Sequence, residues 1–353
     1  MTKRDKTLNA IMRKGKGYVP YHFELCPSLL ERFRELNGRS DYMDYYDMPF
    51  YFVYVQAHGN GGDFLKYFDR LKENTYINEF GVAFEPSDTE HFTQMRFPMR
   101  NFSEISEFES YPYPDPAHGY DWNGLKSDVE RIKASDRLAV GGLAMTVFEI
   151  GWYMRGMENF LMDMLTGEQT LKYHIQRITE IRCEQAKRFA AAGVDVLHLG
   201  DDIATQQSMM FSVSDYRKWI KSAHRAVVEA ARSVNPDIII DYHSDGNCFD
   251  AIEDLIDIGV QILNPVQPEC MDPLKVKEAY GNRLAMRGTL GTQTTLPFGK
   301  PEDVRREALR MIDKAGYDGG LILAPSHMLE PEVPWENIQA LIDTMEEYNK
   351  SFD

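Results

Sequence analysis

The feature that most constrains the fold is an alternation, in the second half of the chain, between short apolar runs and longer amphipathic runs. The apolar runs are RLAVGGLA (137–144), VDVLHLG (194–200), DIIIDYH (237–243), VQILNP (260–265), RLAMRG (283–288) and GLILAP (320–325). Runs rich in Val, Ile and Leu without polar alternation are typical of strands that are buried on both faces. Strands and helices in series predict parallel pairing with right-handed crossovers.

Two further strand candidates precede these runs, GYVPYHFEL (17–25) and MPFYFVYVQ (48–56), which brings the total to eight. A (β/α)8 barrel needs eight strands, so we expect residues 1–353 to form a single TIM-barrel domain of the α/β class. An open doubly wound sheet is the alternative. It has less support because no G-x-G-x-x-G motif follows any predicted strand.

The segments between the strands have helical patterns with end signals. Residues 160–193 finish in Gly193, which suits the position just after a helix. Residues 212–234 open with Ser and Asp at cap-like positions. Residues 300–316 have a Pro just inside the start and a Gly at the end, as helices commonly do. We expect these segments to be the crossover helices.

Residues 57–136 interrupt the alternation. This stretch is rich in Gly, Pro and aromatic residues, and it is much longer than an ordinary loop between a strand and a helix. Its density of Tyr, Phe and Trp argues against disorder. We therefore expect a long insertion after the second strand, part lid and part small subdomain.

The composition argues against several classes of partner. Lys plus Arg is 39 and Asp plus Glu is 55, and the resulting formal charge of −16 disfavours nucleic acid and anionic membranes. No stretch is apolar enough to span a bilayer, and the N-terminus lacks the apolar core of a signal peptide. The four cysteines are widely spaced, with no C-x-x-C pair. We expect a cytoplasmic protein without a disulfide framework, and a homodimer is compatible with the sequence.

Polar residues follow the predicted strands at their carboxyl ends, where TIM-barrel enzymes carry their active sites. Three clusters stand out: HLGDDIATQQ (198–207) with Asp201 and Asp202, YHSDGN (242–247) with His243 and Asp245, and APSHMLEPEVPWEN (324–337) with His327. His and Asp two positions apart in an extended loop share a face. Two imidazoles with one or two carboxylates from different strands match a catalytic zinc site, which has three protein ligands and an open position.

Each cluster also has a plain structural interpretation. An Asp-Asp pair is typical of a helix N-cap beside a solvated acid, and an Asp before a Gly is typical of a turn. His198, inside a strand, is best explained as a core histidine with satisfied hydrogen bonds. The combination favours a metal site, since all three clusters lie at predicted strand ends on one face. We expect His243 and His327 as ligands. Asp202 or Asp245 supplies the third.

The quoted clusters belong to longer stretches in which the chain resembles the uroporphyrinogen decarboxylase superfamily, which also contains zinc-dependent corrinoid methyltransferases. The resemblance covers residues from about 130 to the C-terminus well and the N-terminal part weakly. The matching stretches are TVFEIGWYMRGMENFLMDM, GDDIATQ, HSDGN, GVQILNPVQPECMD, MRGTLGTQTTLPFGKPEDVRREA and LAPSHMLEPEVPWENIQAL. YPYPDP, in the insertion, is also similar to this group.

Two departures narrow what the resemblance implies. The decarboxylases carry an Arg-Gln-Ala-Gly-Arg run after the first strand, whose arginines grip the substrate carboxylates. This chain has YHFELCPSLL there, and the acidic Glu24 would repel a polycarboxylate. The methyltransferases that methylate coenzyme M bind zinc with His-x-Cys and a later Cys, where this chain has His243-x-Asp245 and His327. Such a harder ligand set argues against activation of a thiolate.

The resemblance therefore implies the methyltransferase component of a bacterial O-demethylase system. A zinc ion would stabilise the charge that grows on an ether oxygen, while a methyl group passes from a methoxylated, aromatic substrate to the Co(I) corrinoid (cobalamin) of a partner protein. We expect catalytic roles for Asp201, Asp202, Glu149 and Tyr153, and substrate binding by Glu24, Trp152, Asn264, Gln267 and Gln293. The aromatic-rich insertion would close over the ring.

Two other functions stay open. One is a decarboxylase without a metal, in which Asp201 and Asp202 stabilise a protonated pyrrole. The other is a non-catalytic barrel that binds a tetrapyrrole or a partner protein.

Overall fold

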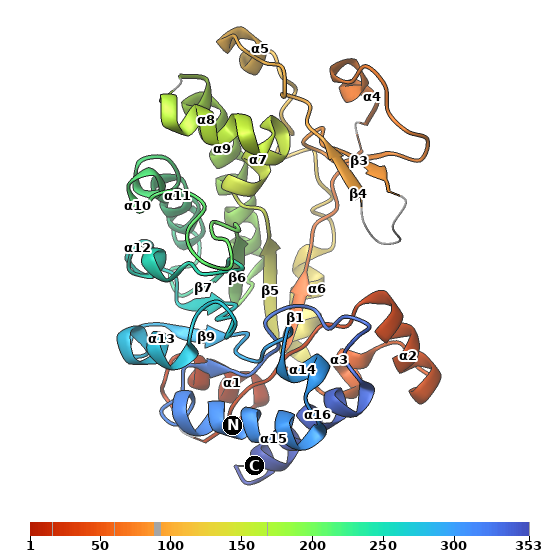
Figure 1. The fold of residues 1–353 in the computed structure, drawn as a ribbon, viewed down its shortest axis with the longest axis vertical. Helices are drawn as coiled ribbons and strands as arrows, with labels where there is room; N and C mark the ends of the chain where they lie inside the picture. The colour runs from red at the N-terminus through yellow and green to blue at the C-terminus, as the bar shows by residue number, and fades with distance from the viewer. Residues whose placement is uncertain (16, 60, 88–92, 168, 353) are drawn as a thin grey trace.

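The computed structural model describes residues 1–15, 17–59, 61–87, 93–167 and 169–352. In this part of the chain, seven parallel strands form one curled sheet in the order β1-β5-β6-β7-β8-β9-β10 (Figure 1). The strands are β1 (Phe50–Val53), β5 (Leu138–Leu143), β6 (Val196–Gly200), β7 (Ile239–His243), β8 (Ile262–Asn264), β9 (Ala285–Arg287) and β10 (Leu321–Ile322). The predicted α/β class with a parallel, TIM-barrel-like sheet is thus confirmed.

Helices cover the outer face of this sheet (Figure 1). The long ones are α9 (Gln169–Ala192), α11 (Lys221–Arg232), α15 (Pro301–Ala315) and α16 (Trp335–Lys350); shorter ones are α2 (Pro27–Asn37), α3 (Tyr42–Tyr45), α7 (Phe148–Arg155), α8 (Met157–Thr166), α10 (Val213–Asp215), α12 (Ile252–Ile258), α13 (Pro273–Tyr280) and α14 (Thr295–Phe298). Two predicted helix ends are confirmed. Helix α15 begins at a proline, and Gly193, just after α9, has a φ of 86°.

Apolar side chains close one end of the curled sheet. Ile11 of α1 (Lys3–Ile11) packs in one cluster with inward side chains from all seven strands of the sheet in the described chain. These residues are Phe50, Leu138, Val140, Val196, Ile239, Ile262, Ala285 and Ile322. Arg4 of the same helix pairs with the buried Asp195, at 2.6 Å between Nη2 and Oδ1. The polar residues of the sheet interior therefore gather at the opposite, carboxyl ends of the strands.

The predicted first strand, residues 17–25, is not a regular strand. It forms isolated bridges, among them Tyr21 with Leu323. The backbone N of His22 donates to Leu323 O at 3.1 Å, and Leu323 N donates to Pro20 O at 2.9 Å. Pro20 has no N–H to add to a ladder. The segment thus lies beside β10, in the place of an eighth strand, and closure into a complete (β/α)8 barrel stays a prediction.

Residues 57–136 carry a small antiparallel sheet in the order β2-β3-β4, among the described residues (Figure 1). Its elements and neighbours are β2 (Tyr76–Ile77), β3 (Ala83–Pro86), β4 (Thr93–Arg96), α4 (Gly61–Phe64), α5 (Ile105–Glu109) and α6 (Leu125–Ala134). Phe80 and Phe108 from this segment belong to the same core as α7 and α9. Helix α6 packs against β1 and β5, as an ordinary crossover helix does. The lid role and the single-domain organisation remain predictions.

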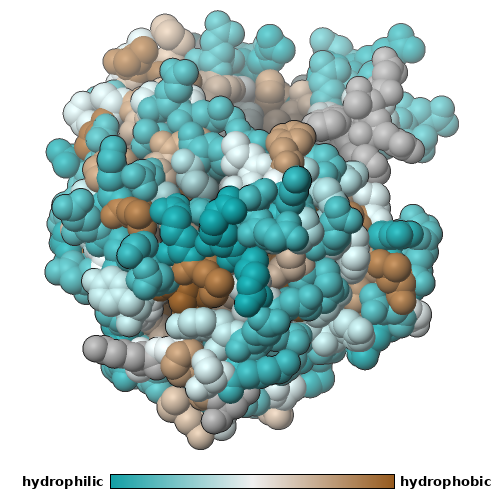
Figure 2. Space-filling model, turned by 60° about the horizontal axis from the view of Figure 1, so that its bottom comes forward, coloured by the Kyte–Doolittle hydropathy of each residue, from teal (hydrophilic) through white to brown (hydrophobic). Residues whose placement is uncertain are grey.

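The face of the molecule seen in Figure 2 is mainly polar. The bottom face of Figure 1, turned forward in Figure 2, shows hydrophilic side chains with small apolar patches between them. Within the described residues, no helix combines the length and the apolar character that a membrane span requires.

Candidate metal centre and active site

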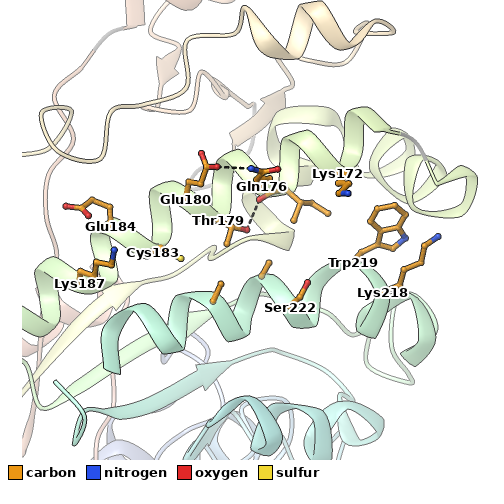
Figure 3. Close-up of a pocket in the computed structure, with 13 residues that line it drawn as sticks. Lys172, Gln176, Thr179, Glu180, Cys183, Glu184, Lys187, Lys218, Trp219 and Ser222 are labelled. Atoms are coloured by element: carbon orange, nitrogen blue, oxygen red, sulfur yellow. Dashed lines mark hydrogen bonds between the residues drawn. The ribbon is translucent and has the colours of Figure 1, made fainter. Parts of the chain in front are cut away.

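A groove of about 650 Å³ lies between α9 and α11, on the outer layer of helices (Figure 3). Its lining includes Cys183 and Trp219, together with several lysine and glutamate side chains. Burial raises the pKa of the Cys183 thiol to about 11, so the thiol stays protonated at neutral pH. None of the predicted site residues lines this groove. The predicted site residues lie instead at the carboxyl ends of the strands.

Three potential metal ligands meet there: Asp202 after β6, and His243 and Asp245 at the end of β7. One ligand atom from each lies within 4.8 Å of the others. His243 Nε2 is 3.7 Å from Asp202 Oδ1 and 3.7 Å from Asp245 Oδ1. All three side chains are half-buried, so each keeps some contact with solvent.

The sheet register brings these groups together. Gly200, at the end of β6, pairs with His243 of β7, and His243 pairs with Asn264 of β8. His243 Nδ1 lies 2.8 Å from Asn264 Oδ1. An amide oxygen accepts, so His243 donates from Nδ1 and turns the Nε2 lone pair toward the two acids. The backbone N of Asp245 also donates to Asp202 Oδ1 at 2.8 Å, which ties the two loops.

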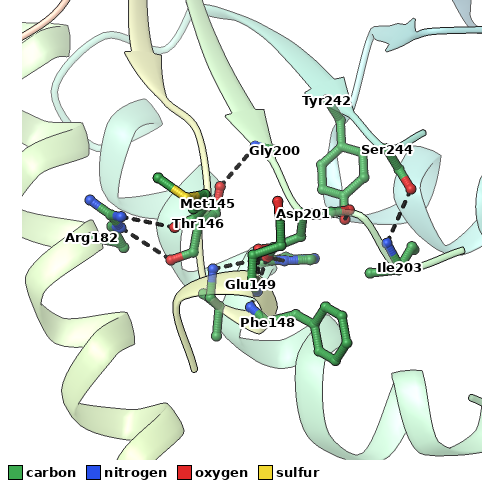
Figure 4. A network of polar contacts seen from close by, with 12 residues as sticks. Met145, Thr146, Phe148, Glu149, Arg182, Gly200, Asp201, Ile203, Tyr242 and Ser244 are labelled. Atoms are coloured by element: carbon green, nitrogen blue, oxygen red, sulfur yellow. Dashed lines mark hydrogen bonds and ion pairs between the residues drawn. The ribbon is translucent and has the colours of Figure 1, made fainter. Parts of the chain in front are cut away.

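Asp201, expected to be catalytic, is fully buried behind this centre (Figure 4). Its carboxylate accepts hydrogen bonds from the backbone N–H groups of Val147, Phe148 and Glu149, at 2.9 to 3.0 Å. His224 Nε2 lies 2.6 Å from the same carboxylate. The three backbone N–H groups are those that an N-capping acid binds, here at the start of α7. Asp201 thereby fixes the helix that carries Glu149.

Glu149 is nearly buried and lies next to the three-residue centre. Its Oε2 accepts from the backbone N of Asp202 at 3.1 Å, and Tyr153 Oη is 3.5 Å from its Oε1. Burial, with the charges of Asp201 and Asp202, raises the pKa of Glu149 to about 9. Its carboxyl group therefore carries a proton at neutral pH. The ring of Trp152 stands 4.2 Å from that of Tyr153, edge to face.

The outer cavity at the strand ends has a volume of about 400 Å³ and lies beside the centre. Asp245, Gln267, Gln293 and His327 all line it. The imidazole of His327 is exposed and stands outside the three-residue group, with Nδ1 3.2 Å from Met328 O. The structure thus brings Asp202, rather than His327, together with the other two ligands. Ligation by His327 stays a prediction.

A second cavity of about 250 Å³, here called the inner cavity, adjoins the centre through His243. Its lining includes His22, Glu24, Phe52, Tyr54, His198, Asn264 and Arg287. The His22 imidazole, with Nε2 3.5 Å from Glu24 Oε1, lowers the pKa of Glu24 to about 2, and Arg287 and His198 add to this. Glu24 is therefore a carboxylate at neutral pH.

Sequence reasoning missed Asp241, a buried acid that bonds to two residues of the inner cavity. Asp241 Oδ2 lies 2.8 Å from His198 Nδ1 and 2.6 Å from Arg287 Nη2. His198 is a bonded, buried histidine as expected, but it also lines the cavity. A signal was present, because Asp241 interrupts an isoleucine run two positions before His243, on the same face of the strand.

Comparison with known families matches residues 77–348 to the family described as uroporphyrinogen decarboxylase (URO-D). Among solved structures, a methyltransferase from Methanosarcina mazei has a TM-score of 0.71 and 18% sequence identity, and the match covers 99% of both chains. At that identity the likeness is one of fold.

Two relatives of this chain differ in function from each other. Methylcobamide:CoM methyltransferase MtaA from Methanosarcina barkeri is 26% identical over 206 residues, covering 55% of this chain and 57% of that protein. Uroporphyrinogen decarboxylase from Thermus thermophilus is 25% identical over 186 residues, covering 52% and 51%. The chain thus spans a little over half the length of these relatives.

Proposed function

The chain belongs to the uroporphyrinogen decarboxylase family, and from this premise we propose that it is a zinc-dependent methyltransferase of the corrinoid branch. In this proposal it moves a methyl group from a methoxylated aromatic compound to the Co(I) corrinoid of a partner protein. The observation that carries the proposal is the meeting of His243 with two carboxylates, Asp202 and Asp245, at the carboxyl ends of adjacent strands.

The donor set fits a catalytic zinc ion. One imidazole nitrogen and two carboxylate oxygens give three protein ligands, and an open position remains for an oxygen of the substrate. Nitrogen and oxygen donors, without a thiolate, make a harder and more electrophilic site, which suits an ether oxygen better than a thiol. His243 is already held in the tautomer that a ligand needs, by Asn264.

When bound, zinc supplies Lewis-acid polarisation of the ether oxygen, and the partner's Co(I) corrinoid supplies the nucleophile. The methyl carbon–oxygen bond breaks with its electron pair on oxygen, so the leaving oxygen needs a proton. We assign this proton to Glu149, whose carboxyl group accepts a hydrogen bond from Asp202 N and lies beside the proposed ligands. Tyr153, beside Glu149, orients that carboxyl group, and Asp201 holds the helix under both.

The outer cavity, rimmed by Gln267, Gln293 and His327, is the side from which we propose that the corrinoid partner approaches. Its volume is larger than that of the inner cavity, and it reaches the same centre through Asp245. Decarboxylation is the second candidate, since decarboxylases are among the relatives. It is disfavoured because Glu24 faces the inner cavity as a carboxylate, and because the buried Asp201 has no surface to offer a pyrrole.

A methyl-transfer screen tests the proposal. The purified chain, loaded with zinc, is mixed with Co(I) cobalamin and a panel of methoxybenzenes, and formation of methyl-cobalt is followed by its absorbance change. We expect transfer with at least one donor, and loss of it in Asp202→Asn. Turnover of a porphyrinogen to a decarboxylated product, with no methyl transfer from any donor, would contradict the proposal.

A further inference from the structure

We propose that Glu24, His22 and Arg287 bind a hydroxyl group of the methyl donor, so that the preferred donor is a neutral methoxyphenol and carboxylated donors are rejected. This inference rests on the proposed function and names the substrate class of the same site. In this inference, Glu24 determines which methoxylated compounds the site prefers as methyl donors.

The first support is a set of buried polar atoms without partners. His22 is 3% exposed; its Nδ1 has no hydrogen-bond partner among the described residues, and its Nε2 lies 3.5 Å from Glu24 Oε1 without the geometry of a hydrogen bond. Arg287 is 6% exposed, and its Nε has no partner in the same part of the chain. Both side chains line the inner cavity. Buried polar groups are nearly always hydrogen-bonded, so these atoms are suited to bind a ligand.

The second support is the balance of charge at this end of the cavity. The guanidinium of Arg287 is already paired with Asp241, at 2.6 Å, so it is not a free cation for an incoming anion. The carboxylate of Glu24 has no such arginine or lysine partner within salt-bridge distance in the described chain. The pKa of Glu24, lowered to about 2, keeps it ionised. A carboxylated ligand would therefore meet a like charge, at a cost in affinity.

The third support is that this end offers both an acceptor and a donor. The Glu24 carboxylate only accepts, while Arg287 Nε–H only donates. A hydroxyl group uses both, because it donates its hydrogen to Glu24 and accepts from Arg287 Nε or a ring nitrogen of His22. An ether oxygen can accept a hydrogen bond from Arg287 but has no hydrogen to donate to Glu24. An ionised carboxylate on the ligand has none to donate either. The pair of groups therefore selects a hydroxyl.

The walls of the cavity suit an aromatic ring. Phe52 and Tyr54 stand with ring centroids 6.1 Å apart and an angle of 12° between their planes. Tyr54 packs over Gly142, where an added Cβ would lie 2.3 Å from the tyrosine ring. An apolar cavity of roughly 150 Å³ holds benzene, so a cavity of about 250 Å³ suits one ring with two small substituents. His198 and His243, with ring centroids 6.0 Å apart, lead from this ring site to the metal centre.

Calorimetric binding to the purified chain, without cobalamin, tests the inference. The ligands are the three methoxyphenol isomers, methoxybenzene and the three methoxybenzoate isomers. We expect the best methoxyphenol to bind roughly 10-fold tighter than methoxybenzene, as for a hydrogen bond to a charged group, and every methoxybenzoate to bind more weakly than methoxybenzene. Glu24→Gln should reduce the advantage of methoxyphenol over methoxybenzene. It should also remove the disadvantage of the methoxybenzoates relative to methoxybenzene.

The matched control is Glu330→Gln, which removes a carboxylate from the outer cavity and should leave this order unchanged. The inference is overturned if a methoxybenzoate binds best, if no ring compound binds, or if Glu24→Gln keeps the wild-type order. The wild-type series alone decides the matter if the variant does not fold. If the chain prefers methoxyphenols but transfers no methyl group, only the proposed function is contradicted. If it transfers a methyl group but prefers methoxybenzoates, only this inference is contradicted.

Discussion

His243 Nδ1 lies 2.8 Å from Asn264 Oδ1, across the register of two neighbouring strands. This contact places the proton of the imidazole on Nδ1 and leaves Nε2 free to face Asp202 and Asp245. Asn264 was expected to bind substrate, but its amide oxygen is already engaged with the proposed ligand. We therefore propose a positioning role for it, because groups that orient a metal-bound histidine also tune its affinity for the metal.

Removing this contact should weaken metal binding. In Asn264→Leu the side chain keeps its approximate size but loses the acceptor, and we expect zinc affinity to fall about 10- to 100-fold. Competition with a chromophoric chelator measures the affinity. Asn264→Asp keeps an acceptor oxygen and should bind zinc more tightly than the leucine variant. Equal affinities for the two variants would show that Asn264 does not act through His243.

The loop after β7 depends on a glycine beside the metal centre. Gly246 has a φ of 81°, and an added Cβ would lie 2.3 Å from the backbone oxygen of Thr205. Gly246→Ala should therefore shift Asp245 and cost about 2 kcal/mol or more of unfolding free energy. Gly38→Ala is the matched control, since Gly38 has a φ of 70° with open space around it and should lose about 1 kcal/mol.

Denaturant unfolding measures both free energies, and zinc titration measures the site. We expect Gly246→Ala to weaken zinc binding, while Gly38→Ala leaves it unchanged. If the two variants lost equal stability and bound zinc alike, close packing against Thr205 would not matter to the loop.

His174 should make the protein sensitive to acid. It is almost fully buried, with Nδ1 2.7 Å from Tyr113 Oη, and burial lowers its pKa from 6.5 to about 4. The unfolded chain therefore binds the proton more readily than the folded one. Stability from this residue is complete above pH 6.5 and is lost as the pH falls from about 6.5 toward 4, by about 2 kcal/mol at pH 5.

Urea unfolding at pH 7 and pH 5 checks this expectation. His174→Gln keeps a donor and an acceptor but does not titrate, so the variant should lose about 2 kcal/mol less on acidification than the wild type. His118, whose side chain is 87% exposed, is the control, and His118→Gln should follow the wild type. An unchanged pH dependence in His174→Gln would refute the assignment.

The strands and their polar ends could be predicted because burial on both faces leaves a clear sequence pattern. Six apolar runs became β5 to β10, and residues at the carboxyl ends of two of them, β6 and β7, form the centre. Residues 17–25 carry a similar pattern but pair in isolated bridges, since Pro20 removes a donor from the ladder. The periodicity of apolar residues indicates which side chains face the core, but it does not show whether each backbone N–H is available to form a sheet.

The contacts between distant elements could not be predicted in the same way. Asp201 and Asp202 are neighbours in the sequence, yet one caps α7 in the interior and the other lies half-buried beside His243 and Asp245. That division depends on where α7 begins relative to the end of β6, about 50 residues away in the chain. The position of His327 depends likewise on the path of a long loop after β10.

Zinc titration of the chelator-treated chain tests the central claim most directly. The account predicts one tightly bound equivalent in the wild type. It also predicts affinities lowered by more than about 100-fold in His243→Ala, Asp202→Asn and Asp245→Asn, since losing a ligand should cost more than losing a group that orients one. His118→Ala serves as the histidine control and should bind like the wild type. Absence of bound zinc in the wild type, or wild-type affinity in the three variants, would contradict the account.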